Sequence, residues 1–316
     1  MFQKRFILLL KTHKNVFQQR NLSADVGFIG IGNMGVRMAN NLVKKGRKLK
    51  VYDVSKAAAQ SVTGAHVCST PEEAATDVDL VITMLPEGAT VKKVLTADDG
   101  ILKGINKNSL LIDSSTIDPL DAQELHKITK EAGIKFLDTP VSGGVIGAEA
   151  GTLTFMVGGD EGVAKKVEPY LMQMGGRIMH CGGPGAGQIA KLCNNLILGI
   201  SMIGIAEGMN LGAKMGLDLN TLNNVINTST GRCWSSDTCN PVPGIMPNVP
   251  ASNNYDGGFQ TKLIAKDLAL AQNVAVSCGA PILLGSAAHQ IFRTMAAYGY
   301  ANKDFSAVYK FLQGQN

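Results

Sequence analysis

Lys191 and Asn195 are the two residues whose types and spacing best suit acid–base chemistry. They lie four positions apart in an apolar stretch, and on a helix this spacing puts both side chains on one face. Apolar neighbours would bury the lysine, and burial favours the neutral amine, which lowers the lysine pKa toward neutral pH. A lysine in that range can take and return a proton. The alternative is a lysine that extends from a half-buried helix to solvent.

A second candidate site is formed by Ser142, Gly143 and Gly144, within the segment DTPVSGG. A hydroxyl group beside backbone amides that no side chain covers suits a small carboxylate. The segment therefore predicts a binding site for a small acid, and the alternative is a glycine hinge.

The spacing G-x-G-x-x-G is formed by Gly30, Gly32 and Gly35, between an apolar run and a helical stretch. The first glycine allows a tight turn, the second lets the backbone approach a pyrophosphate, and the third lets the helix pack closely on the strand. The amides that open the helix, at Asn33 and Met34, add partial positive charge. This context predicts a dinucleotide site, and the alternative is a glycine turn kept for packing.

Asp53 indicates which dinucleotide is bound. It follows the second apolar run, 18 residues after Gly35, where a carboxylate can accept hydrogen bonds from ribose hydroxyls. A 2′-phosphate would meet this negative charge, and Val54 and Ser55 supply no arginine to neutralise it. The sequence thus predicts NAD rather than NADP, although Lys56 offers one nearby cation.

Two turn segments are expected beside the nicotinamide half of the cofactor. Leu85 and Pro86 end one apolar run, and Thr116 lies just after another. Both places fall at the carboxyl edge of a parallel sheet, where open α/β folds bind their ligands. The alternative is ordinary turn chemistry.

The elements that must position these residues divide the chain in two. Apolar runs at 26–30, 49–52, 80–85 and 110–112 alternate with helical stretches, which predicts a parallel α/β sheet covered on both faces. After the glycine-rich residues 182–187 the pattern changes to long helices. We therefore predict an α/β Rossmann-type dinucleotide-binding domain over residues 25–184, followed by an all-α C-terminal domain over residues 185–316.

Two segments of the second domain stand out. The stretch 188–215 is apolar nearly all round and predicts a long buried helix that connects the domains, since its polar residues argue against a membrane span. Residues 229–258 are rich in Pro, Asn, Ser and Gly, and Arg232 and Trp234 favour an ordered lid or pocket wall there.

The composition and charge of the chain limit the kinds of partner that we expect. With 316 residues, of which 45% are hydrophobic and 17% charged, the chain is globular. Residues 1–24 hold no acidic residue and account for the whole net charge of +5, so the remainder gives no reason to expect nucleic acid or a membrane as partner. The basic residues of this leader are Lys4, Arg5, Lys11, Lys14 and Arg20.

The leader itself predicts an amphipathic mitochondrial transit peptide and hence the mitochondrial matrix. Its apolar run at 6–10 is too short for a secretory signal or a membrane span. The alternative is a solvated arm on a cytosolic protein. The six cysteines show no C-x-x-C spacing and form no recognisable metal pattern with the five histidines, so we expect free thiols and no metal.

Four segments in order, VGFIGIGNMG, DTPVSGG, GPGAGQIAKLCNN and IAKDLALA, resemble the 3-hydroxyacid dehydrogenases related to 6-phosphogluconate dehydrogenase. The resemblance covers essentially the whole chain after residue 24. It implies that Lys191 is catalytic, that Asn195 helps to position the substrate, and that Ser142, Gly143 and Gly144 bind its carboxylate.

The same resemblance extends to the cofactor, the reaction and the assembly. It implies cofactor contacts at Leu85, Pro86, Thr116 and Lys266, and at Thr90, where this family more usually has Asn. It implies reversible NAD-dependent oxidation of a small 3-hydroxy acid, and a helical domain that forms a homodimer or homotetramer. Family members that reduce tartronate, glyoxylate or succinate semialdehyde are the alternative. A non-catalytic nucleotide-binding relative is expected to lack the lysine that this chain has.

Overall fold

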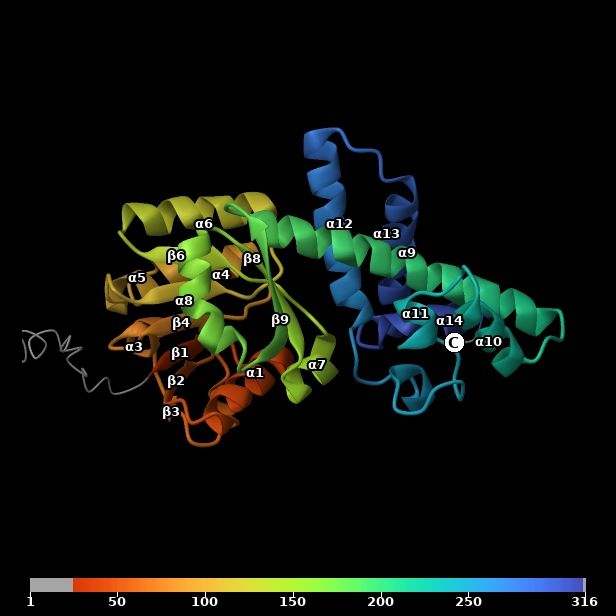
Figure 1. The fold of residues 1–316 in the computed structure, drawn as a ribbon, viewed down its shortest axis with the longest axis horizontal. Helices are drawn as coiled ribbons and strands as arrows, with labels where there is room; N and C mark the ends of the chain where they lie inside the picture. Colours follow the sequence, from red (N-terminus) through yellow and green to blue (C-terminus); the bar gives the residue numbers. More distant parts are fainter. Residues whose placement is uncertain (1–24, 315–316) are drawn as a thin grey trace, which may run out of the picture.

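A computed structural model describes residues 25–314, so the predicted transit peptide lies outside the described residues. The first part of the chain forms a nine-stranded sheet in the order β3-β2-β1-β4-β5-β6-β8-β7, with β9 beside β8 (Figure 1). The strands are β1 (Val26–Ile29), β2 (Leu49–Tyr52), β3 (His66–Val67), β4 (Leu80–Thr83), β5 (Leu110–Asp113), β6 (Lys135–Asp138), β7 (Val141–Ser142), β8 (Leu153–Gly158) and β9 (Gly175–Gly182).

Helices cover both faces of this sheet, as the continuous apolar runs predict. Every residue of β1 is buried, and Phe28 and Ile29 pack into separate cores because successive side chains point to opposite faces. The helices are α1 (Asn33–Lys44), α2 (Lys56–Gln60), α3 (Pro71–Ala75), α4 (Gly88–Thr96), α5 (Ile101–Gly104), α6 (Pro119–Glu131), α7 (Gly144–Ala150) and α8 (Glu161–Leu171).

One part of the sheet departs from the predicted parallel arrangement. Strand β8 runs antiparallel to β6 and to β7. A parallel crossover needs a dozen or more residues, whereas residues 143–152 between β7 and β8 hold only the short helix α7. This connection reverses the chain, so the Rossmann-type domain ends in a mixed sheet.

The second part of the chain is helical, which together with the sheet confirms the predicted fold class. A third core gathers side chains from its helices, with Phe292 and Met202 among the buried members. The elements are α9 (Ala186–Lys214), α10 (Leu219–Thr228), α11 (Trp234–Asp237), η1 (Pro250–Asn253), α12 (Thr261–Cys278), α13 (Leu283–Met295), η2 (Ala296–Tyr300), η3 (Phe305–Ala307) and α14 (Val308–Leu312).

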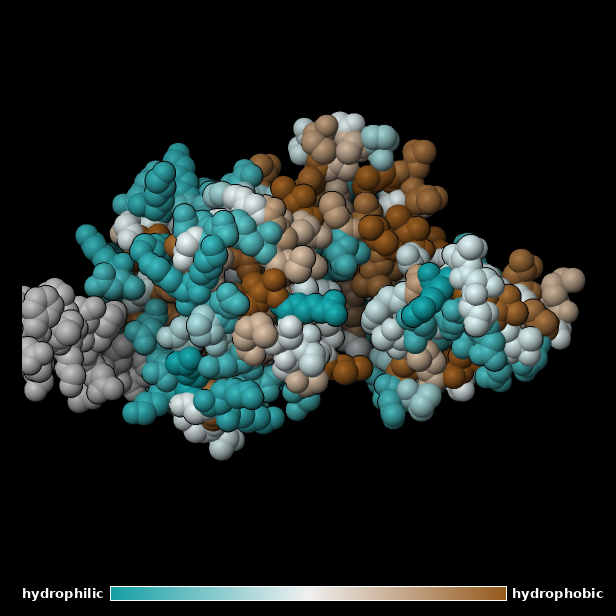
Figure 2. All heavy atoms as spheres, viewed as in Figure 1, coloured by the Kyte–Doolittle hydropathy of each residue, from teal (hydrophilic) through white to brown (hydrophobic). Residues whose placement is uncertain are grey.

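Helix α9 runs out of the sheet domain and through the helical domain (Figure 1). By length and composition it could cross a membrane, but it packs against β8 at one end and against α12, α13 and α14 farther along. The expectation of a buried connecting helix is met only in part, because Ile197 and Leu211 are each 66% exposed. Figure 2 shows apolar surface over this part of the molecule.

The segment 229–258 is ordered against the helical domain. Tyr255 is buried and donates its hydroxyl hydrogen bond to the carbonyl of Pro241 at 3.0 Å. Arg232 pairs with Asp237 at 2.8 Å, whereas Trp234 is 48% exposed. The ordered character agrees with the expectation, and the role of the segment as a lid or pocket wall stays a prediction.

Candidate active site at the junction of the two domains

The glycine turn after β1 fits a pyrophosphate. Gly30 has a φ of +97°, and a side chain there would collide with the carbonyl of Met84. A Cβ atom at Gly35 would collide with the carbonyl of Gly30, whereas one at Gly32 would meet nothing within 4 Å. Helix α1 begins with neither an acidic residue in its first turn nor a side-chain cap, so its amides are available to an anion. Asn33 lies exposed at this helix start, beside the half-buried Met34.

Asp53 follows β2 and is fixed beside this turn. Its Oδ2 accepts a hydrogen bond from the amide of Ile31 at 2.7 Å, and its Oδ1 accepts one from the amide of Ser55 at 2.7 Å. Each carboxylate oxygen has a second lone pair for a ribose hydroxyl. The residues on β1, α1 and β2 therefore fit NAD.

The structure brings three of the expected cofactor contacts together. The ammonium of Lys266, on α12, donates to the carbonyl of Thr116 at 2.7 Å and lies 3.4 Å from the carbonyl of Pro86. Leu85 is tied to the same edge, since its amide donates to Ser115 Oγ at 2.8 Å. These bonds join the helical domain to the carboxyl edge of the sheet.

Thr90 shares no hydrogen bond with that group among residues 25–314. It lies on α4, and its hydroxyl donates to Oε1 of Glu87, the N-cap residue of that helix, at 3.3 Å. A contact between Thr90 and a cofactor stays a prediction.

Lys191 is buried in the first turns of α9, with 8% of its surface exposed. Burial lowers the pKa of this lysine to about 8, an effect that the negative charge of Asp267 opposes and the positive charge of Lys266 reinforces. An amine with this pKa is partly neutral near physiological pH, as a general base requires. The lysine therefore lies in the environment expected from its apolar neighbours.

Asn195 is fully buried one turn farther along α9. Its Nδ2 donates to Asp267 Oδ2 at 2.6 Å, and its Oδ1 accepts from Asn194 at 3.1 Å. Asp267 is 3% exposed, and its Oδ1 lies 3.2 Å from the ammonium of Lys266. This aspartate was missed by sequence reasoning, although an acidic residue in the apolar segment IAKDLALA is a usable signal.

Asp138 anchors the start of α9 and was also missed as a functional candidate. It is fully buried, and its carboxylate accepts from the amides of Gly185 at 2.9 Å and Gln188 at 3.2 Å, and contacts His126 Nε2 at 2.9 Å. The negative charge stabilises the positive end of the helix. Its position at the head of DTPVSGG was the available signal.

The side chain of Gln188 completes the anchor. Its Oε1 accepts from the amide of Ile117 at 3.1 Å, and its Nε2 donates to the carbonyl of Ser115 at 2.8 Å. Because Gln188 lies one turn before Lys191, these bonds fix the lysine relative to the edge of the sheet.

The buried carboxylate of Asp113 stabilises the same carboxyl edge of the sheet. Asp113 Oδ1 accepts from Ser115 Oγ at 2.6 Å and from Thr83 Oγ1 at 2.7 Å. Burial raises the pKa of Asp113 to about 6, while these hydrogen bonds oppose the shift. The network fixes Ser115, which in turn holds the amide of Leu85.

The predicted carboxylate site lies at the end of β7. Ser142 is half-buried, and Gly143 and Gly144 have φ angles of +135° and +60°, which a side chain would strain. Helix α7 starts there without an acidic residue or a side-chain cap. Among residues 25–314 no hydrogen bond links this segment to Lys191, although β7 pairs with β8 and α9 packs on β8.

A dinucleotide-binding Rossmann-type domain, joined to a helical domain that carries a buried lysine to the cofactor edge, defines an NAD-dependent dehydrogenase. Two family models cover nearly all described residues. Residues 25–183 match the NAD-binding domain of 6-phosphogluconate dehydrogenase, and residues 185–312 match the NAD-binding domain of NADP-dependent 3-hydroxyisobutyrate dehydrogenase.

Named relatives agree with these models. The mitochondrial 3-hydroxyisobutyrate dehydrogenase of Bos taurus is 54% identical over 91% of this chain and 86% of its own length. A probable mitochondrial 3-hydroxyisobutyrate dehydrogenase of Dictyostelium discoideum is 49% identical over 99% of this chain and 98% of its own.

A solved structure agrees as well. The 3-hydroxyisobutyrate dehydrogenase of Mycobacterium tuberculosis, solved with L-serine, has a TM-score of 0.86 and 44% identity over 92% of this chain and 99% of its own. The chain belongs to the 3-hydroxyisobutyrate dehydrogenase family.

Proposed function

We propose that this protein oxidises 3-hydroxyisobutyrate to methylmalonate semialdehyde with NAD, a step of valine catabolism. The observation that carries the proposal is the buried Lys191, whose pKa is lowered to about 8 beside the bonded pair Asn195 and Asp267. The names of the relatives supply the substrate. The proposed cofactor contacts are Gly30, Gly32, Asn33, Met34, Gly35, Asp53, Leu85, Pro86, Thr90, Thr116 and Lys266.

Lys191 acts as the proton acceptor in the oxidation. Its neutral amine takes the proton of the substrate hydroxyl, and in the reverse direction its ammonium returns a proton to the aldehyde oxygen. When bound, NAD supplies the nicotinamide ring that accepts hydride from the substrate carbon.

Asn195 and the glycine segment orient the substrate. An amide nitrogen carries two protons, and the bond to Asp267 occupies one, which leaves the other for the reacting oxygen of the substrate. Ser142, Gly143 and Gly144 bind the carboxylate through a hydroxyl and free amides. Together these groups orient the hydroxyl-bearing carbon of the substrate relative to Lys191.

The decisive experiment compares substrates at fixed cofactor. NADH absorbance is followed with 3-hydroxyisobutyrate, L-serine and 4-hydroxybutyrate, and the reductive direction with tartronate semialdehyde, glyoxylate and succinate semialdehyde. Highest kcat/KM with 3-hydroxyisobutyrate supports the proposal. Higher efficiency with another acid or aldehyde assigns the chain to a sister activity within the same family.

We further propose the mitochondrial matrix as its location. The leader 1–24 combines basic and apolar residues without acid, and the relatives are named mitochondrial. Deletion of residues 1–24 from a fluorescently tagged chain should release the protein into the cytosol. Unchanged targeting of the deleted chain contradicts this part of the proposal.

The proposed assembly is a homodimer or homotetramer formed through the helical domain. Leu283 and Leu284 are 85% and 68% exposed and line an apolar groove of about 370 Å³ with Leu196 and Ile200. Exposed apolar patches of this kind mark contact surfaces. Light scattering should give a mass above that of one chain, and Leu284→Glu should lower it. A monomeric unmodified protein contradicts the assembly.

A further inference from the structure

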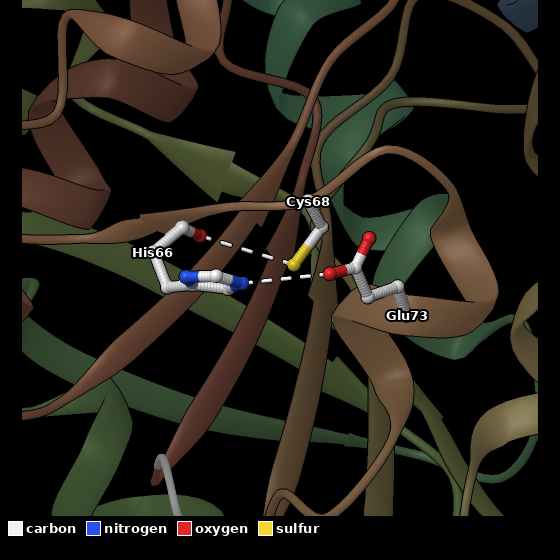
Figure 3. Close-up of side chains that lie close together, drawn as sticks. All are labelled: His66, Cys68 and Glu73. Atoms are coloured by element: carbon white, nitrogen blue, oxygen red, sulfur yellow. Dashed lines mark hydrogen bonds and ion pairs between the residues drawn. The ribbon is translucent and has the colours of Figure 1, made fainter.

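Three side chains of different chemistry meet at the β3 edge of the sheet. His66 opens β3, Cys68 follows its end, and Glu73 comes from the short helix α3 (Figure 3). His66 Nε2 lies 3.4 Å from Glu73 Oε1, and one ligand atom from each of the three residues lies within 4.8 Å of the others. Figure 3 shows the thiol sulfur beside the gap between the imidazole and the carboxylate.

We propose that His66, Cys68 and Glu73 bind a divalent metal ion of the zinc class. A thiolate, an imidazole and a single carboxylate oxygen are ligands that Zn²⁺ and Co²⁺ accept, whereas Mg²⁺ and Ca²⁺ require oxygen ligands. The three protein ligands leave the fourth tetrahedral position to water. The 3.4 Å separation of His66 Nε2 and Glu73 Oε1 suits two ligands of one tetrahedral ion, and the Cys68 sulfur would move toward them on metal binding.

Hydrogen bonds to neighbouring residues hold Glu73 and Cys68 in place. Glu73 Oε2 accepts from the amide of Ser69 at 2.7 Å, and the Glu73 amide donates to Thr70 Oγ1 at 3.1 Å, so Oε1 alone faces the histidine. The amide of Cys68 donates to the carbonyl of Val51 on β2 at 2.8 Å. Such outer bonds fix ligand direction before the ion arrives.

The cluster is also accessible. The side chains of His66 and Glu73 are 64% and 43% exposed, whereas Cys68 is 6% exposed, so an ion enters from solvent and meets the thiol at the inner side. Cys68 Sγ donates to the carbonyl of His66 at 3.8 Å, and its proton leaves for solvent when the metal–sulfur bond forms.

The cluster of His66, Cys68 and Glu73 lies away from the proposed catalytic residue. Strand β3 lies at one end of the sheet order, whereas α9, which carries Lys191, packs on β8 toward the other end. The bound ion would join β3 to α3 and stabilise this edge, and it would take no part in the reaction.

The test uses the full chain, purified without a polyhistidine tag and freed of metal with a chelator. We expect Co²⁺ to produce a sulfur-to-cobalt charge-transfer band that saturates at one equivalent, and Zn²⁺ to displace it. Cys68→Ser should abolish the band. His66→Gln should keep a band but weaken the affinity at least tenfold. Cys278→Ser removes an exposed cysteine elsewhere and should change neither.

Thermal unfolding is measured in parallel, with Zn²⁺ raising the midpoint of the unmodified protein and of Cys278→Ser but not of Cys68→Ser. Absence of a charge-transfer band in the unmodified protein overturns the proposal, as does a band that survives in Cys68→Ser. If Cys68→Ser fails to fold, His66→Gln decides, because its exposed side chain leaves folding intact. Unchanged cobalt affinity in that variant overturns the proposal.

Discussion

Asn195 on α9 donates a 2.6 Å hydrogen bond to Asp267 on α12, and this bond joins two helices beside the buried Lys191. The same carboxylate raises the pKa of the lysine against the larger opposing effect of burial. Asp267 therefore links the position of the amide to the proton affinity of the amine.

Replacement Asp267→Asn should move the pH profile of oxidation. Loss of the negative charge lowers the pKa of Lys191 further, so the neutral amine persists to lower pH and the acid limb of kcat/KM shifts downward. Reduction at neutral pH should slow, because less ammonium is present. Asp256→Asn, at an exposed ion pair with Lys303, is the control and should leave the profile in place. An acid limb that stays or moves upward contradicts the role of Asp267.

Lys191→Ala should lower kcat by at least about 100-fold, because general acid–base catalysis typically contributes that much or more. Circular dichroism checks that the fold is kept. Lys214→Ala, an exposed lysine at the end of the same helix, should retain normal turnover. A folded Lys191→Ala enzyme with unchanged kcat would exclude the lysine from the reaction.

Lys191→Met should stabilise the fold at neutral pH. The folded-state pKa is about 8, below the ordinary 10.5, so the lysine destabilises the native state fully below pH 8, and between pH 8 and 10.5 the unfolded chain binds more protons. This penalty falls as pH rises toward 10.5 and is as much as about 3 kcal/mol at pH 7. Urea unfolding at pH 7 and pH 10.5 measures it. An equal gain at both pH values contradicts the burial argument.

Asp138→Asn should loosen the start of α9. It removes the negative charge and one acceptor from the amides of Gly185 and Gln188, which should cost about 1 to 3 kcal/mol of unfolding free energy. Displacement of Lys191 should lower kcat, with little change in the KM for NAD. Asp160→Asn, at the exposed N-cap of α8, keeps a good capping residue and is the matched control. Equal effects of both substitutions would remove the special role of Asp138.

Asp53→Ser should relax the choice of cofactor. The carboxylate repels a 2′-phosphate, so the unmodified protein should prefer NAD to NADP by at least about tenfold in kcat/KM. The variant should lose efficiency with NAD and gain with NADP. Side-by-side assays of NADH and NADPH formation measure both. A preference for NADP in the unmodified protein would show that Lys56 or another cation outweighs the aspartate.

Features with short-range causes were predictable from sequence. The turn at Gly30 and the acid at Asp53 follow from local steric and electrostatic needs, and the burial of Lys191 follows from its apolar neighbours. The reversal of β8 was not predictable from the apolar pattern, because parallel and antiparallel buried strands have similar composition. The exposed face of α9 was missed for a related reason, since an all-round apolar helix gives no sign of which side stays exposed.

The sequence by itself determined the Rossmann-type domain, the helical second domain, the dinucleotide turn and the candidate lysine, because each depends on spacing within one or two elements. Only the tertiary structure decided which distant residues meet. Asp267 reaches Asn195, Asp138 reaches the start of α9, and Glu73 reaches His66 and Cys68, each from a different element. Such contacts depend on how helices dock on the sheet and on one another, which is set by the packing of whole cores and not by local pattern.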